Sequence, residues 1–195
     1  MHKLVLVACL AVPSFAFAQK AEKAEKGEKA AKAGSPSQEL VMAIQFNGKE
    51  LLDIAEDKMY PDAKLDYKPM PEMRSFAEQL LHAAKANQMF LEMINGKQPD
   101  FGDLKRSEYK TRADIVNVLK KSIDDLADAT KKLGDKGLAK PIKLPFIPMP
   151  VTTGTAIGIA VGHMSEHYGQ LVVYERLNKV VPPATRNQPK GPPQP

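Results

Sequence analysis

Two histidines, His163 and His167, lie four residues apart in the last long apolar segment of the chain. On a helix this spacing stacks both imidazoles on one face, with their Cβ atoms about 5–6 Å apart. Two neutral imidazole nitrogens held in this way can chelate one divalent ion of borderline softness. Apart from His2, the chain has only one other histidine, His82. The pair therefore predicts a metal site, with His82 as the candidate third ligand.

His82 lies in the middle of an earlier segment that also has helical periodicity. If the two helices pack together, the three imidazoles converge. Three protein ligands with a position left to water are typical of a catalytic zinc site rather than a structural one. Such a site lowers the pKa of a bound water or thiol and so makes a nucleophile near neutral pH.

The stretch His163–His167 also matches His-x-x-Glu-His, the pattern of inverted zinc proteases, in which Glu166 would be the general base. That family needs an acidic ligand far downstream. Here only Glu175 follows, before a proline-rich tail, and no sheet is predicted. We therefore name no catalytic residue. A second alternative is that the histidines are ordinary core or surface residues of amphipathic helices.

Four segments have the apolar spacing of helices, and no segment of comparable length alternates with period two. They span about residues 37–59, 71–95, 111–133 and 153–178. Capping boxes are predicted at the first, from Ser35 and Gln38, and at the third, from Thr111 and Asp114. Gly134 is expected to end the third helix. The pattern predicts an all-α four-helix bundle.

The connections between these segments are longer than the roughly 2–8 residues usual in bundles, which favours long crossover connections. The stretch Ile142–Pro150 contains Pro145, Pro148 and Pro150 and cannot be helical. We expect it to lie extended over one end of the bundle.

Residues 1–18 have the layout of a cleavable signal peptide. Lys3 supplies the positive start, Leu4–Val12 the short apolar run, and Ala16–Ala18 the small-x-small pattern before a cut after Ala18. A lipoprotein site at Cys9 is the alternative, but it lies too close to the start. Cleavage would remove the only cysteine, which excludes thiol chemistry by the mature chain. The prediction is a periplasmic or secreted protein.

The remaining chain is predicted to consist of a Lys/Glu/Ala-rich linker over residues 19–38, the bundle over 39–181 and a proline-rich disordered tail over 182–195. Part of the net charge of +5 comes from five lysines of the linker, whose charge three glutamates partly offset. No basic stripe interleaved with aromatics is present, so nucleic acid is not an expected partner. No segment after the signal reaches the length of a membrane span, so no stable membrane insertion is expected after cleavage.

Two stretches carry a family resemblance. Pro71–His82 resembles the second helix of the DinB/YfiT-like superfamily, and His163–Leu171, continuing through Tyr174–Leu177 to Val181–Pro183, resembles its last helix and exit. The resemblance covers about residues 39–183, and the ordered histidine triad is its most specific mark. It implies a four-helix bundle with up-down-down-up topology.

The resemblance also implies a divalent metal, zinc or nickel, held by His82, His163 and His167. Some members of this superfamily are thiol-dependent transferases that use bacillithiol, mycothiol or glutathione. Arginine often follows the last histidine in the family, whereas Tyr168 stands here. Export also places the protein where cytosolic thiols are scarce, and both departures weaken the transferase assignment.

We therefore expect an exported, metal-dependent hydrolase or transferase that acts on a small molecule, with a thiol as one candidate partner. The alternative is a non-enzymatic metal-binding or stress-related envelope protein. The sequence is compatible with a homodimer.

Overall fold

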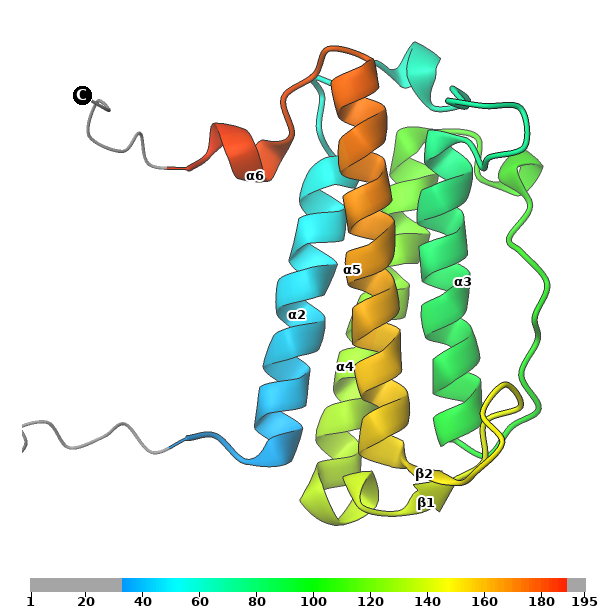
Figure 1. The fold of residues 1–195 in the computed structure, drawn as a ribbon, viewed down its shortest axis with the longest axis vertical. Coiled ribbons are helices and arrows are strands. Elements are labelled where there is room, and N and C mark those ends of the chain that lie inside the picture. The colour runs from blue at the N-terminus through cyan, green and yellow to red at the C-terminus, as the bar shows by residue number, and fades with distance from the viewer. Residues whose placement is uncertain (1–32, 189–195) are drawn as a thin grey trace, which may run out of the picture. The chain divides into compact units, whose positions relative to one another are not determined.

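The computed structural model describes residues 33–188, which form a bundle of four long helices (Figure 1). These are α2 (Pro36–Ala55), α3 (Phe76–Ile94), α4 (Arg112–Leu138) and α5 (Thr153–Leu177). Each of α2 and α3 packs against both α4 and α5. Along the chain the helices run up, down, down and up, so the predicted topology and the all-α class are confirmed.

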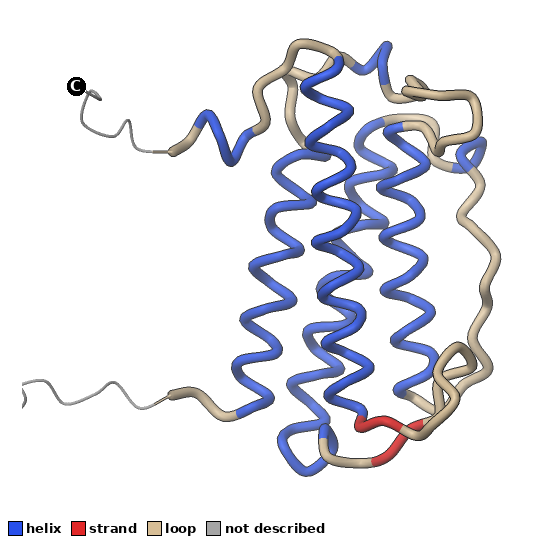
Figure 2. Tube along the Cα trace, viewed as in Figure 1, coloured by secondary structure: helices blue, strands red, loops and turns tan. Residues whose placement is uncertain are grey.

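The three connections differ in their paths. Residues 56–75, which contain the short 3-10 helix η1 (Asp62–Lys64), stay at one end of the bundle, and residues 139–152 stay at the other (Figure 2). Only residues 95–111, which contain η2 (Arg106–Glu108), run the length of the bundle beside α3. We call residues 95–111 the crossover segment. Because it returns the chain to its starting end, α4 runs parallel to α3.

Capping side chains fix most helix starts. The predicted capping box of Thr111 and Asp114 is present at α4. The expected start of the second helix at residue 71 is wrong, because Ser75 and Glu78 form a capping box that begins α3 at Phe76. Gly134, with φ 58°, breaks the helical conformation, but α4 does not end there as expected and continues for one more turn to Leu138.

The core lies between the four helices and consists mainly of aliphatic residues with a few aromatic rings. α2 is continuous through Asn47 and Gly48. At Gly48 a Cβ atom would lie 2.5 Å from Cγ2 of Ile123 on α4. Glycine is therefore needed at this position for the close approach of α2 and α4.

The proline-rich stretch is non-helical, as predicted. It is bracketed by two short antiparallel strands, β1 (Pro141–Ile142) and β2 (Val151–Thr152) (Figure 2). Among the described residues, no helix is long and apolar enough to cross a membrane.

Two predicted boundaries need correction. α2 begins at Pro36, inside the segment expected to be linker, because proline suits a first helical turn. α6 (Pro183–Arg186) forms one helical turn inside the expected disordered tail, where Arg186 pairs with Asp57 at 2.9 Å. The predicted signal peptide, most of the linker and residues 189–195 lie outside the described residues.

Candidate metal centre

The structure brings the three predicted ligands together. His82 comes from the second turn of α3, and His163 and His167 come from the middle of α5. Their ring centroids are 4.4 Å apart for His163 and His167, 4.9 Å for His82 and His167, and 5.3 Å for His82 and His163. One nitrogen from each ring lies within 4.8 Å of the others. Metal binding by these residues stays a prediction, but its geometric condition is met.

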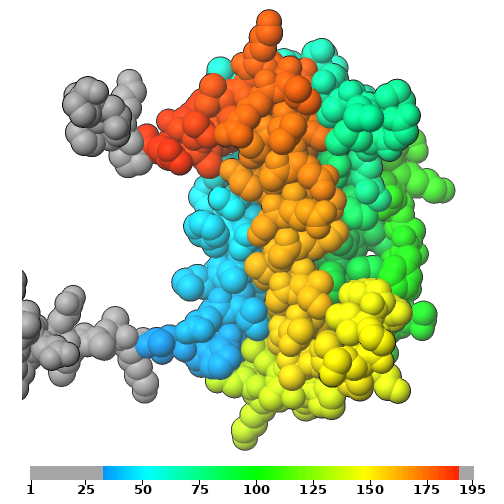
Figure 3. Space-filling view, in the orientation of Figure 1, coloured from blue at the N-terminus to red at the C-terminus, as the bar shows by residue number. Residues whose placement is uncertain are grey.

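The triad lies between the interior and the surface. His167 is buried, with 4% of its surface exposed, whereas His82 and His163 are partly exposed. Figure 3 shows that α5 lies at the surface along one face of the bundle. The bundle thus covers one side of the triad and leaves room for solvent on the other.

Nε2 of His167 lies 3.1 Å from Nε2 of His163. Two nitrogens that bind one tetrahedral zinc ion, each at about 2.0–2.1 Å, are separated by roughly 3.3 Å. The observed pair is thus spaced closely enough to share an ion.

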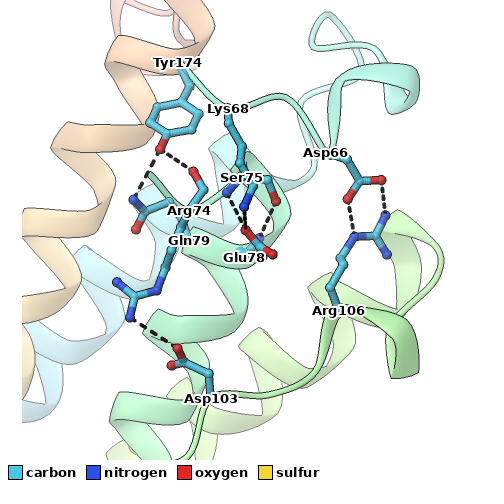
Figure 4. A network of polar contacts seen from close by, with 9 residues as sticks. All are labelled: Asp66, Lys68, Arg74, Ser75, Glu78, Gln79, Asp103, Arg106 and Tyr174. Atoms are coloured by element: carbon cyan, nitrogen blue, oxygen red, sulfur yellow. Dashed lines mark hydrogen bonds and ion pairs between the residues drawn. The ribbon is translucent and has the colours of Figure 1, made fainter. Parts of the chain in front are cut away.

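A chain of hydrogen bonds fixes the tautomer of His167. The Tyr174 hydroxyl donates to the backbone carbonyl of Arg74 at 2.6 Å, so its oxygen is free to accept from Nε2 of Gln79 at 3.4 Å (Figure 4). Nε2 of Gln79 also donates to Oε1 of Gln170 at 2.8 Å. Oε1 of Gln79 therefore accepts from Nδ1–H of His167 at 2.8 Å. This arrangement leaves a lone pair on Nε2 of His167, which faces the other histidines.

A carboxylate likewise fixes the tautomer of His82. Oδ1 of Asp103, on the crossover segment, lies 2.7 Å from Nδ1 of His82. Its Oδ2 lies 3.3 Å from Nη2 of Arg74 (Figure 4). Burial alone would raise the pKa of Asp103, but the hydrogen bonds from His82 and Arg74 hold it below its ordinary value. Asp103 is thus ionised and accepts from Nδ1–H, which leaves Nε2 of His82 as a ligand atom. A carboxylate behind a histidine ligand is a common partner at metal sites.

His163 completes the test of whether the residues fit a cation. Its Nδ1 is buried and has no hydrogen-bond partner within residues 33–188. If Nδ1 carries the proton, the lone pairs of His163 and His167 face each other at 3.1 Å and repel unless a cation lies between them. If Nε2 carries it, His163 donates to His167 and Nδ1 is left as a buried acceptor without a donor. The first state suits a divalent ion bound by imidazole nitrogens.

Burial favours the neutral form of His163 and His167. Burial lowers the pKa of His167 to about 3, with further lowering by His163, His82 and Arg74. Burial and the charge of His82 also lower the pKa of His163. Neutral imidazole is the metal-binding form, so protons compete weakly for these two nitrogens at neutral pH.

Other residues singled out in the sequence have smaller roles. Glu166 is exposed and accepts a hydrogen bond from Nε2 of Gln170 at 3.3 Å. Gln170 accepts a hydrogen bond from Gln79 and forms none with an imidazole of the described residues. The sequence analysis missed Gln79 and Asp103 as supporting residues. Gln79 precedes His82 by three positions on the same helix, which is a usable signal; Asp103 lies in an irregular segment and gives none.

The comparisons with known proteins agree with this architecture. A family model described as the DinB superfamily matches residues 45–171. A search of the curated proteins found no match.

Several solved structures share the fold. A DinB-like protein from Bacillus subtilis is 19% identical, with a TM-score of 0.55, over 72% of this chain and 92% of that one. A DinB-like protein from Bacillus cereus is 16% identical, with a TM-score of 0.59, over 74% of this chain and 93% of that one. YfiT from Bacillus subtilis, described as a probable metal-dependent hydrolase with an unusual four-helix bundle topology, is 13% identical, with a TM-score of 0.61, over 78% of this chain and 93% of that one.

Proposed function

Because this chain belongs to the DinB superfamily, we propose that it is a metal-dependent enzyme in which His82, His163 and His167 hold one divalent ion. One observation carries the proposal: hydrogen bonds from outside the triad commit Nδ1 of both His82 and His167, so that both Nε2 lone pairs point inward.

The proposed ion is zinc or nickel, since a set of neutral imidazoles suits both. A bound ion would act as a Lewis acid on a substrate oxygen or water at its open side. The chain's own residues prepare the site. Asp103 and Gln79 orient two of the imidazoles, and the partly exposed rings of His82 and His163 face the approach from solvent.

A hydrolase of a small molecule is the reaction class we favour. YfiT, which shares the fold, is described as a probable metal-dependent hydrolase, and the mature chain would contain no thiol of its own. A transferase that uses an external thiol is the second candidate, supported only by family resemblance. We also propose that the protein is exported, on the basis of the signal-like layout of residues 1–18.

Metal analysis of the tag-free mature protein tests the site. After loading with zinc or nickel and desalting, we expect a stoichiometric ion in the wild type and in Glu166→Gln, an exposed neighbour on the same helix. We expect His82→Ala and His163→Ala to lose most of it. Less than about a tenth of an equivalent in the loaded wild type would refute the metal site.

Activity is tested separately with the loaded protein. An activated ester reports hydrolysis, and an electrophile with added thiol reports transfer. We expect ester hydrolysis that is lost in His163→Ala and retained in Glu166→Gln. A cobalt-substituted protein that shows a closed four-ligand tetrahedral site with no exchangeable water would argue for a metal-binding protein without catalysis.

A further inference from the structure

Arg74 lies beside the triad in a position that the metal site itself does not require. It immediately precedes Ser75, the N-cap of α3, and the Tyr174 hydroxyl holds its backbone carbonyl at 2.6 Å. Its side chain extends from this anchored point toward Asp103, which in turn holds His82 (Figure 4). The hydrogen bond from Tyr174 thus anchors the backbone of Arg74, and Asp103 holds its guanidinium beside the triad.

The guanidinium of Arg74 has few partners compared with two other arginines of the bundle. Arg112 donates through all three nitrogens, to Asp62 at 2.6 Å and to the carbonyls of Ala55 and Tyr60 at 2.6 and 2.7 Å. Arg106 contacts both carboxylate oxygens of Asp66, at 2.7 and 3.2 Å, and also the carbonyl of Tyr109.

Arg74, by contrast, makes one contact of 3.3 Å within the described part of the chain, to an oxygen of Asp103. Its side chain is 41% exposed, against 13% for Arg112 and 22% for Arg106. Most of its five N–H donors are therefore free to bind a ligand.

A pocket of about 320 Å³ has both Arg74 and Asp103 in its wall. This volume is at the lower end of the range for small-molecule sites. Lys68, Lys105 and Arg106 also line the pocket, but Lys68 is paired with Glu78 and Arg106 with Asp66, so Lys105 is the main source of further positive charge. Of its acidic residues, Glu78 is held by Ser75 and Lys68, and Asp103 by His82 and Arg74, whereas Glu72 is exposed.

We propose that Arg74 anchors an oxyanion, a carboxylate or phosphoryl group, and that the substrates of the triad are therefore anionic small molecules. The planar fork of an arginine matches the oxygens of both groups in two parallel hydrogen bonds. The charged group of the substrate lies on Arg74, partly in the pocket, while its reacting group faces the histidines. This substrate class rests on the proposed function, but the binding of an oxyanion by Arg74 does not.

The test is a titration of the folded mature protein, with and without zinc, followed by NMR at the Nε–Hε signal of Arg74. The probes are acetate, inorganic phosphate and acetamide, the neutral analogue of acetate. We expect millimolar binding of acetate and phosphate and no shift with acetamide. The relative affinity for acetate and phosphate identifies which oxyanion the site prefers.

Three variants complete the experiment, with affinity measured by calorimetry. Arg74→Gln should bind the anions at least about tenfold more weakly, and Arg74→Lys should fall between, since it keeps the charge but loses the fork. Arg176→Gln removes the same charge from an exposed position on α5, about 13 Å along the helix from His167, and should bind as the wild type does. Equal anion affinity in the wild type and Arg74→Gln would overturn the proposal.

The zinc content of each sample distinguishes a failure of the oxyanion proposal from a failure of the metal-site proposal. Anion binding that is lost in Arg74→Gln while no sample takes up zinc would support the oxyanion site and refute the proposed function. Stoichiometric zinc with anion binding independent of Arg74 would refute only the present inference.

Discussion

Replacing Glu175 by glutamine should remove a pH dependence from the stability of the bundle. Glu175 lies on α5 and is fully buried, and neither of its carboxyl oxygens has a hydrogen-bond partner in residues 33–188. Burial and, to a smaller extent, the nearby charge of Asp57 raise its pKa to about 8, against the opposing charges of Arg186 and Arg112. At neutral pH the folded protein therefore keeps a proton on Glu175 that the unfolded chain releases.

The direction and size of the pH effect on the free energy of unfolding follow from this difference in bound protons. Between the ordinary pKa of 4.5 and the folded pKa of about 8, the folded state binds one more proton than the unfolded state. The free energy of unfolding consequently falls as pH rises, by about 1.4 kcal/mol per pH unit, and levels off above pH 8. From pH 5 to pH 8 the loss amounts to about 4 kcal/mol, an upper limit if water relaxes around the buried carboxylate.

Asp57 does not alter this slope. Burial pushes its pKa upward, but Arg186 and the backbone amide of Met59 hold it below the ordinary 3.8. The stability contributed by Asp57 is therefore present throughout the range from pH 5 to pH 8 and is lost only in more acidic solution.

The assay is urea unfolding of the wild type and of Glu175→Gln, followed by circular dichroism at several pH values from 5 to 8. We expect the stability of the variant relative to the wild type to increase by about 4 kcal/mol across this range, whatever the offset at pH 5. Metal binding changes with pH equally in both proteins and cancels in the comparison. Glu108→Gln, at an exposed position, should differ from the wild type in its free energy of unfolding by the same amount at every pH. Parallel curves for the wild type and Glu175→Gln would refute the reasoning.

Two further predictions concern packing and the support of the triad. Gly48→Ala should lower the free energy of unfolding by about 1–3 kcal/mol, because its Cβ would lie 2.5 Å from a methyl carbon of α4. Gly158→Ala, at an exposed helical position with nothing within 4 Å, should raise it by about 0.5–1 kcal/mol in the same denaturation assay. Asp103→Asn should weaken zinc affinity by about 10-fold or more in a chelator competition, because the ionised partner of a histidine ligand is lost. Asp66→Asn, which alters an ion pair on Arg106 instead, should leave zinc affinity unchanged.

Much of the fold was predictable because its signals are local. The capping box at Thr111 and the break at Gly134 each depend on a few adjacent residues, and the structure has both. The second helix was placed five residues too early because proline is also compatible with a turn before the cap, and the capping box of Ser75 and Glu78 was overlooked. The need for glycine at position 48 could not be predicted, since its reason is a side chain about 75 residues away on α4.

The candidate site was predictable to the same extent. The spacing of His163 and His167 is a local pattern, and the scarcity of histidine pointed to His82. The residues that orient these rings depend on tertiary contacts. Asp103 and His82 are 21 residues apart in sequence. No sequence periodicity predicts which residue of an irregular segment will contact a given helix face. The backbone position of Arg74 likewise depends on a tertiary contact, the hydrogen bond that the Tyr174 hydroxyl on α5 donates to its carbonyl.

The topology of the bundle and the support of the triad have a common origin in the crossover segment. A short hairpin after α3 would make α4 antiparallel to it and would leave the outer side of His82 without a carboxylate. Because the segment instead returns along α3, it carries Asp100 to Lys85, at 2.8 Å, and then Asp103 to His82 and Arg74. The first contact fixes the path of the segment one turn before it reaches the triad. The parallel arrangement of α3 and α4 is thus the condition under which one loop orients a predicted metal ligand and holds the arginine that we propose binds the substrate.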